Sequence, residues 1–483
     1  MLTWCFPGSF PYISIYAQVI ASAMTEEKPA RASFSSHLGF VLSSAAAAVG
    51  LGNLWRFPYL TSHYGGGIFV VIYILMAVSF GFALLIAETS IGRKTGKSCI
   101  AAFGDLCEKY RWLGYLETVV PIIILSYYFV IGGWVMKWFS LSVSEGLGGI
   151  SENPGYWWDY ITGTIGGMAD PAVWFIVFAA LCFLCVYIGV DRGIEKVSRA
   201  LMPALFVLTF VIIAYEMTLP GIWDGIVFYL DPDISKLNAG TFLGAVSQIF
   251  YSLSIAMGIM ITYGSYMRKQ DNIEKAVRNI SLIDTGTAIF MGLMIVPVAA
   301  MFGFGDSKSM GLLFTAMPQV FASMPGGAVI GPLFYLLVIF AAVTSAVALL
   351  EAVVSQFGDA LHLHRHRAVI VSLAILIPLG ILVVMGFGPL MTDFSPFDQG
   401  AGWLGIFDTL SNVIIMPIVA ISTCLFISWG IGVKSITDEV ESGGNTFRSK
   451  RLFVVMIRYI CPVFLSLMLV LGLLDMYGVF SVY

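Results

Sequence analysis

Long apolar windows constrain this chain more than any other feature. A helix that crosses a bilayer needs about 20 mostly apolar residues, and the first such window begins near residue 38. The others run approximately over residues 67–87, 118–138, 172–189, 200–219, 242–266, 283–304, 329–350, 368–387, 404–431 and 452–479. Hydrophobic residues make up 58% of the sequence and charged residues 11%. We therefore predict an all-α polytopic membrane protein with about 11 transmembrane helices.

Basic residues fall in alternate loops between these windows. They follow the even-numbered spans, and they are Arg93, Lys94, Lys97, Lys109, Arg111, Arg192, Lys196, Arg199, Arg268, Lys269, Lys275, Arg278, Arg365, Arg367, Lys434, Arg448, Lys450 and Arg451. The other loops are mainly acidic. By the positive-inside rule the amino terminus is cytoplasmic and the carboxyl terminus exterior, in the inner (plasma) membrane. The net charge of −4 gives no indication of a nucleic-acid partner.

The first window contains an interruption, AAAVGLGNLWRFP, over residues 46–58. Gly50 and Gly52 each lower helix stability by about 1 kcal/mol relative to alanine, which favours a local break. Backbone groups freed at membrane depth are tolerated only where they face protein or line a cavity. Freed carbonyls suit a small hard cation, and freed N–H groups suit a carboxylate. The alternative is an unbroken helix whose glycines allow close helix packing.

A second interruption lies in the sixth window, at QIFYSLSIAMG over residues 248–258. It stands five spans after the first, and paired interruptions in two equivalent halves indicate an inverted-repeat transporter. We predict a cytoplasmic segment over residues 1–33, of which 1–23 are disordered or not translated. Two repeats of five helices follow over residues 34–220 and 221–433, and a loop with an eleventh helix over residues 434–483.

Four ionisable residues lie inside the predicted spans, where such groups usually mark ion or substrate paths. They are Glu88, Asp284 at the start of the seventh span, Glu351 and Asp408. Arg56 lies about one helical turn beyond Asn53, toward the outside, and can reach Asp408 to form a gate over the site. A static buried ion pair is the alternative.

Three blocks of the sequence resemble the neurotransmitter:sodium symporter family, in particular its bacterial amino-acid transporters. The blocks are AVGLGNLWRFPY at 48–59, QIFYSLSIAMG with ITYGSYMRK at 248–269, and AAVTSAVALLE at 341–351. The resemblance extends from about Arg31 to Tyr477. It implies a core of five plus five helices in inverted repeat, as in the leucine transporter, with helices 1 and 6 broken and one extra helix at the carboxyl end.

The resemblance also implies two sodium ions and no organic cofactor. The first ion would be bound by Ala48, Asn53, Ser252 and Asp284, together with the substrate carboxylate. The second would be bound by Ala46, Val49, Ala341, Thr344 and Ser345. Both are sets of oxygen ligands, which hard cations prefer. The resemblance favours this role for Thr344 and Ser345 over the common alternative, a hydroxyl bonded back to its own helix. Because Asp284 supplies a fixed negative charge, we predict that chloride is not required.

The implied substrate is a neutral apolar or aromatic L-amino acid. Gly50 stands where monoamine transporters of the family have an acidic residue, so the substrate must bring its own carboxylate. The implied pocket is Ala47, Ala48, Gly50, Leu51, Gly52, Ile124, Tyr128, Tyr251, Ser252, Ser254, Met257, Ser345 and Leu349. An outer gate would use Arg56 and Asp408, with Gln248 as a bridge and the rings of Tyr128 and Tyr251 as an aromatic lid. An inner gate would use Arg31, Ser265, Tyr266 and Asp359.

Other classes of protein fit the sequence less well. An ion channel needs a continuous polar pore, whereas the polar residues here gather at two breaks. An amino-acid sensor would use the same site without transport. An enzyme would need a nucleophile with its base or a metal-ligand cluster, and the sequence shows neither pattern.

Overall fold

The structure, a computed structural model, describes residues 34–305, 309–390 and 402–476, and these residues form helices joined by loops. Predictions for residues 1–33, Arg31 included, lie outside this part of the chain. The helices are α2 (His37–Ala48), α3 (Phe57–His63), α4 (Gly67–Met76), α5 (Phe82–Thr95), α6 (Cys99–Leu106), α7 (Arg111–Ser144), α8 (Gly148–Glu152), α9 (Tyr156–Ile161), α10 (Ala169–Ile188), α11 (Lys196–Glu216) and α12 (Ile222–Leu230). They continue as α13 (Ala239–Ser252), α14 (Ile259–Ser265), α15 (Ile273–Met301), α16 (Ser309–Gly311), α17 (Met317–Ser323), α18 (Gly327–Leu361), α19 (Arg365–Met385), α20 (Gly402–Asp408), α21 (Met416–Leu425), α22 (Val433–Val440), α23 (Lys450–Val455) and α24 (Cys461–Met476).

Nine helical stretches in the described residues are long and apolar enough to cross a membrane. A bent pair, α2 with the stretch Gly52–His63, makes a tenth span. The apolar pair α13 and α14 occupies the predicted sixth window and is interrupted between its two halves. Many large apolar side chains on these helices, such as Leu75, Leu184 and Ile370, face outward and are more than half exposed. A water-soluble surface rarely carries so much apolar area, which lipid would cover in a membrane.

The first helix breaks where the glycines predicted. Ser36 caps α2, because its hydroxyl accepts a hydrogen bond from Gly39 N at 3.0 Å. The helix ends at Ala48, and Val49 has extended backbone angles. The chain then re-enters a π-helical turn at Gly52 and continues into α3, at 52° to α2. This change of direction interrupts the regular helix at Val49 and Gly50, so that carbonyl groups at the end of α2 have no following helical turn to bond with.

The sixth span is broken over a longer stretch. Asn238 and Thr241 begin α13 with a reciprocal capping box, and the helix ends at Ser252. Between α13 and α14, Ser254, Ala256 and Gly258 all have positive φ angles, of 55°, 60° and 71°. Only glycine adopts such angles without steric cost. The predicted interruption is therefore present and lies next to the first one.

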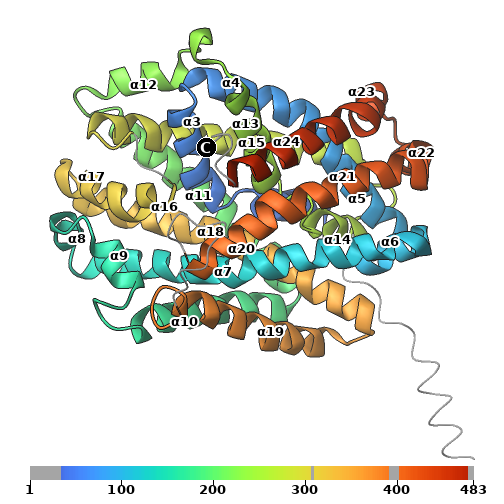
Figure 1. Cartoon of the computed structure of the whole chain (residues 1–483), viewed down its shortest axis with the longest axis horizontal. Coiled ribbons are helices and arrows are strands. Elements are labelled where there is room, and N and C mark those ends of the chain that lie inside the picture. The colour runs from blue at the N-terminus through green and yellow to red at the C-terminus, as the bar shows by residue number, and fades with distance from the viewer. Residues whose placement is uncertain (1–33, 306–308, 391–401, 477–483) are drawn as a thin grey trace, which may run out of the picture. The chain divides into compact units, whose positions relative to one another are not determined.

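Many of the described helices belong to two packed groups, and Figure 1 labels members of both. One contains α7, α10, α18 and α19, in which α7 packs on the other three. The other contains α2, α5, α14 and α15, with α14 packed on α5 and α2 packed on α15. Because α2 also packs on α18, the first break lies between the two groups.

One detail of the sequence analysis was wrong. Asp284 was placed at the start of the seventh span, but α15 begins at Ile273 and Asp284 lies well inside it. The first turns of α15 include charged residues, Glu274 and Lys275 among them, so the apolar window begins later than the helix.

Candidate binding site for substrate and ions

A small cavity lies between the two broken helices. The structure brings all the predicted pocket residues to its wall: Ala47, Ala48, Gly50, Leu51, Gly52, Ile124, Tyr128, Tyr251, Ser252, Ser254, Met257, Ser345 and Leu349. They come from α2, the first break, α7, α13, the second break and α18. Side chains on this wall are apolar, aromatic or hydroxylated, and none is charged.

Close packing explains the two glycines of the first break. A Cβ atom on Gly52 would lie 2.4 Å from Cδ1 of Tyr251, and one on Gly50 would lie 2.6 Å from Oγ of Ser345. The hydroxyl of Tyr128 accepts a hydrogen bond from Leu51 N at 3.4 Å. The glycines therefore let rings and hydroxyls from three other elements approach the broken backbone.

Beside the cavity, Asn53, Ser252 and Asp284 form a buried cluster of oxygen atoms. Asn53 Nδ2 donates to Asp284 Oδ1 at 2.9 Å. Ser252 Oγ lies 2.7 Å from Asn53 Oδ1 and 2.8 Å from both carboxylate oxygens of Asp284. Tyr73 adds a hydroxyl at 3.5 Å from Asp284, which sequence reasoning missed. Carboxylate, amide and hydroxyl oxygens are the ligands that a hard cation prefers.

A second group of oxygen atoms joins α18 to α2. Ser345 Oγ lies 3.1 Å from the Ala47 carbonyl oxygen and 3.2 Å from that of Val49. Thr344 Oγ1 donates within its own helix, to the carbonyls of Phe340 and Ala341 at 3.0 Å. Ala46 and Ala341 are fully buried nearby. The hydroxyl of Ser345 thus contacts backbone oxygens at the end of α2, whereas the hydroxyl of Thr344 contacts backbone oxygens of its own helix, α18.

Comparison with known proteins places the chain in a family. The model of the sodium:neurotransmitter symporter family matches residues 31–159 and 160–481. The chain belongs to this family. It is 32% identical to an uncharacterized sodium-dependent transporter of Bacillus subtilis, YhdH, over 95% of this chain and all of that protein. An uncharacterized sodium-dependent transporter of Methanocaldococcus jannaschii, MJ1319, is 32% identical over 85% of this chain and 84% of its own length.

A solved structure shows the same fold. The crystal structure of MhsT in complex with L-phenylalanine is 31% identical in sequence and superposes with a TM-score of 0.80. The match covers 91% of this chain and 99% of MhsT. The protein is therefore a multi-pass, sodium-dependent symporter with a leucine-transporter-like fold, and not an enzyme.

A second cavity adjoins the symporter's central cavity, and Tyr251 lines both. Arg56, Asp408, Tyr127 and Tyr251 are on its wall. Arg56 donates to Ser247 Oγ at 2.6 Å, whereas Asp408 accepts from Tyr127 at 3.0 Å and from Asn412 at 2.6 Å.

The expected ion pair between Arg56 and Asp408 is therefore not formed in this structure, because each side chain is held by other partners. The expected bridge through Gln248 is also not formed, because its Nε2 donates to the Gly52 carbonyl at 3.2 Å. Ser247 and Asn412 were not anticipated, since nothing in the local sequence relates them to Arg56 or Asp408.

Near the ends of α14 and α18, three of the predicted inner-gate residues, Ser265, Tyr266 and Asp359, take part in these contacts with other described residues. Asp359 accepts hydrogen bonds at 2.7 Å from the backbone N–H and the hydroxyl of Ser98. Tyr266 donates to Glu351 at 2.7 Å, and Ser265 to Thr262 O at 2.5 Å. Glu351 also forms an ion pair with Arg365 at 2.6 Å.

The start of α2 is held by a carboxylate that the sequence analysis did not identify. Glu195 is buried and accepts from Ser35 N at 2.8 Å and from Ser35 Oγ at 2.6 Å. Arg199, one turn further along, pairs with Glu195 at 2.5 Å and also bonds to Ser36. These contacts join the residues just before α2 to the segment that leads into α11.

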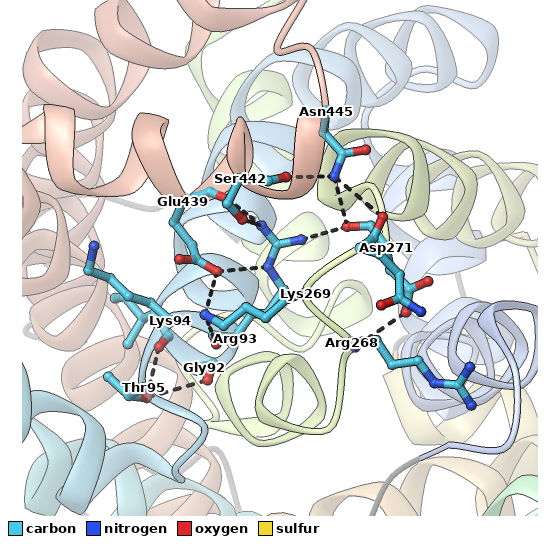
Figure 2. Close-up of polar contacts among 12 residues, drawn as sticks. Gly92, Arg93, Lys94, Thr95, Arg268, Lys269, Asp271, Glu439, Ser442 and Asn445 are labelled. Carbon is cyan, nitrogen blue, oxygen red and sulfur yellow. Dashed lines mark hydrogen bonds and ion pairs between the residues drawn. The ribbon is translucent and has the colours of Figure 1, made fainter.

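Another polar cluster joins the end of α5 to α22 and to the segments that follow α14 and α22 (Figure 2). Arg93 is completely buried and contacts Glu439 at 2.9 Å, Ser442 Oγ at 2.9 Å and the Asp271 carbonyl at 2.5 Å. Lys269 donates to the same Glu439 carboxylate at 3.0 Å. We call these residues the Arg93 cluster.

Proposed function

We propose that this symporter imports neutral hydrophobic or aromatic L-amino acids together with sodium, by alternating access, and that it does not need chloride. The observation that carries the proposal is the central cavity, which is lined by residues of both helix breaks and has no charged side chain on its wall. An amino acid there must satisfy its two charges with backbone groups, hydroxyls and a cation. Its side chain would meet Ile124, Met257 and Leu349. The L-phenylalanine bound by MhsT supports this class of substrate.

Coupling between ion and substrate follows from a shared residue. Ser252 lies on the cavity wall and also contacts Asn53 and Asp284. A sodium ion bound by those three residues would lie next to the substrate carboxylate, so each ligand would raise the affinity for the other. A second ion bound by Ser345 and the Val49 carbonyl would join α18 to the first break. Two ions predict a sigmoidal dependence of uptake on sodium concentration.

Transport further requires that access to the cavity alternates. We assign the outer gate to Arg56, Gln248 and Asp408, which would come together over the occupied cavity, and the inner gate to Arg31, Ser265, Tyr266 and Asp359. The topology predicted from the loops places the amino terminus in the cytoplasm.

The decisive experiment is uptake of labelled L-phenylalanine into proteoliposomes that contain the purified protein. We expect accumulation with an inward sodium gradient and none with potassium or choline in its place. Asn53→Ala and Ser345→Ala should each lower uptake by roughly tenfold or more, because each removes a ligand oxygen from a charged partner. Ser372→Ala is the matched control, since Ser372 is also buried but bonds only within α19, to the Ala368 carbonyl at 2.8 Å.

Three results would contradict the proposal. Sodium-dependent binding without uptake would identify a sensor, and single-channel currents would identify a channel. Normal sodium dependence in both variants would overturn the assignment of the ion sites.

Chloride is tested in the same vesicles. Asp284 is a fixed carboxylate beside Asn53 and Ser252, so the negative charge that balances the sodium ions is already part of the protein. Replacing chloride by gluconate on both sides should leave the rate of uptake unchanged. A large loss of uptake in gluconate would show that the Asp284 carboxylate does not supply that charge.

A further inference from the structure

The segment over residues 434–449, which contains most of α22 and leads into α23, contacts the loop between α14 and α15 (Figure 2). Asn445 Nδ2 donates to two carbonyl oxygens of this loop, at 3.4 and 3.5 Å. A Cβ on Gly443 would lie 2.7 Å from a third carbonyl oxygen of the loop. The two stretches of backbone are therefore in direct contact. We call residues 434–449 the clasp and residues 267–272 the clasped loop.

Two buried side chains join the clasp to the two ends of the clasped loop. Arg93, at the end of α5, donates to the Asp271 carbonyl at 2.5 Å and pairs with Glu439 of the clasp at 2.9 Å. Glu274, in the first turn of α15, accepts hydrogen bonds from two successive backbone N–H groups of the clasp, at 2.9 and 2.8 Å. Arg93 and Glu274 are both buried. Because buried charges are costly unless they are paired and hydrogen-bonded, these contacts favour one fixed arrangement of clasp and loop.

The clasped loop also contacts the helices that surround the central cavity. It follows directly after α14, which packs backbone to backbone on α5, because a Cβ on Gly264 would lie 2.4 Å from the Thr89 carbonyl oxygen. From the loop itself, Arg268 donates to the Ser35 carbonyl at 3.1 Å, just before α2 begins. The start of α2 therefore lies against a loop whose position the clasp determines.

We propose that Arg93 and Glu274 are positioning residues, which act through the clasp to hold Arg268 against Ser35 and so keep the inner end of α2 closed. This inference rests on the proposed alternating access. The clasp follows the two inverted repeats predicted from the sequence, and none of its residues is on the wall of either cavity described above. It acts through the clasped loop and not by contact with substrate or ions.

A positioning role and a purely structural role have different consequences for binding. If the inner side opens more readily, fewer molecules have the conformation that binds sodium and substrate, so the apparent affinity for L-phenylalanine falls by that fraction. A high sodium concentration should restore the affinity, because sodium binding favours the closed conformation. Loss of folded protein would instead lower the number of binding sites and leave the affinity of the remaining protein unchanged.

The direct test measures how fast Ser43→Cys reacts with a maleimide in purified protein that lacks the native cysteines. Ser43 lies on α2 and is 1% exposed, so the reaction requires movement of α2. Without further changes, the reaction should be slow in sodium with L-phenylalanine and faster in potassium. Glu274→Met removes the acceptor of two hydrogen bonds and should raise the rate in sodium by roughly tenfold or more. Arg93→Met should act in the same direction.

Glu441→Met is the matched control. Glu441 also belongs to the clasp, but its ion pair with Lys450, at 2.9 Å, does not involve the clasped loop. This change should leave the reaction rate unaltered. Should Glu274→Met fail to fold, Asn445→Ala removes the side-chain contacts to the middle of the clasped loop and should raise the rate in the same direction.

A double-mutant cycle tests the route through Arg268. Arg268→Met removes the contact with Ser35 and should itself raise the reaction rate. If the clasp acts through Arg268, adding Glu274→Met should then have little further effect, so that the two changes are not additive.

Unchanged rates in both Glu274→Met and Arg93→Met would overturn the inference, and so would fully additive effects of Glu274→Met and Arg268→Met. Raised rates that saturating sodium does not lower would show a general loss of structure, with the same consequence. Protein without clasp substitutions that reacts equally fast in sodium and potassium would overturn the proposed alternating access and this inference with it. A normal response to sodium there, with clasp variants that match Glu441→Met, would overturn the inference alone.

Discussion

At the scale of single residues, the two glycines of the first break make a sharp prediction. A methyl group on Gly52 would overlap the ring of Tyr251, and one on Gly50 would overlap the hydroxyl of Ser345. Gly52→Ala and Gly50→Ala should therefore reduce L-phenylalanine binding by roughly tenfold or more, because the clash displaces groups that form the cavity. Binding to purified protein measures this effect.

Gly286→Ala is the matched control. Gly286 lies inside α15, and a Cβ there would meet nothing within 4 Å. This change should leave binding intact and stabilise the helix by about 0.5–1 kcal/mol. Equal effects of all three substitutions would show that the glycines of the break are not special.

Residues of the pocket could be anticipated because they belong to contiguous motifs, such as Gly50 and Gly52 in the first break. Tyr73, Glu195 and Glu274 could not, because each acts on a partner far away in the sequence and no local pattern marks it. The pairing of Arg56 with Asp408 was expected from the depth of the two residues in their spans and from the family resemblance. Neither shows that Ser247 and Asn412 offer closer partners in this structure.

At the scale of elements, the broken helices were predictable from glycines and serines, but helix ends were not. The apolar window marked the seventh span only from residue 283, whereas Asn272 caps α15 and its hydrogen bond to Lys275 N, at 2.8 Å, starts the helix at Ile273. Hydropathy detects the part of a helix that crosses lipid, and capping determines where the helix begins.

The Arg93 cluster gives a prediction about how these elements are joined. Among the described residues, Arg93→Met would leave Glu439 with the exposed Lys269 as its one charged partner. Breaking a buried ion pair on one side typically costs 3–5 kcal/mol, so the melting temperature of the purified protein should fall by several degrees. Lys97→Met is the control. Its ion pair with Asp105 is as short, at 2.6 Å, but both side chains are more than 40% exposed, and such pairs contribute about 0–1 kcal/mol.

At the scale of the whole molecule, the alternation of basic loops predicts which face of the symporter lies in the cytoplasm. Ser235 and Thr446 are both exposed, in loops on predicted opposite sides. In a variant without the native cysteines, Ser235→Cys should react with a membrane-impermeant maleimide on intact cells. Thr446→Cys should react only after permeabilisation, because its loop is rich in lysine and arginine. The reverse pattern would invert the topology, and with it the assignment of Arg56 and Asp408 to the outer gate and of Asp359 to the inner one.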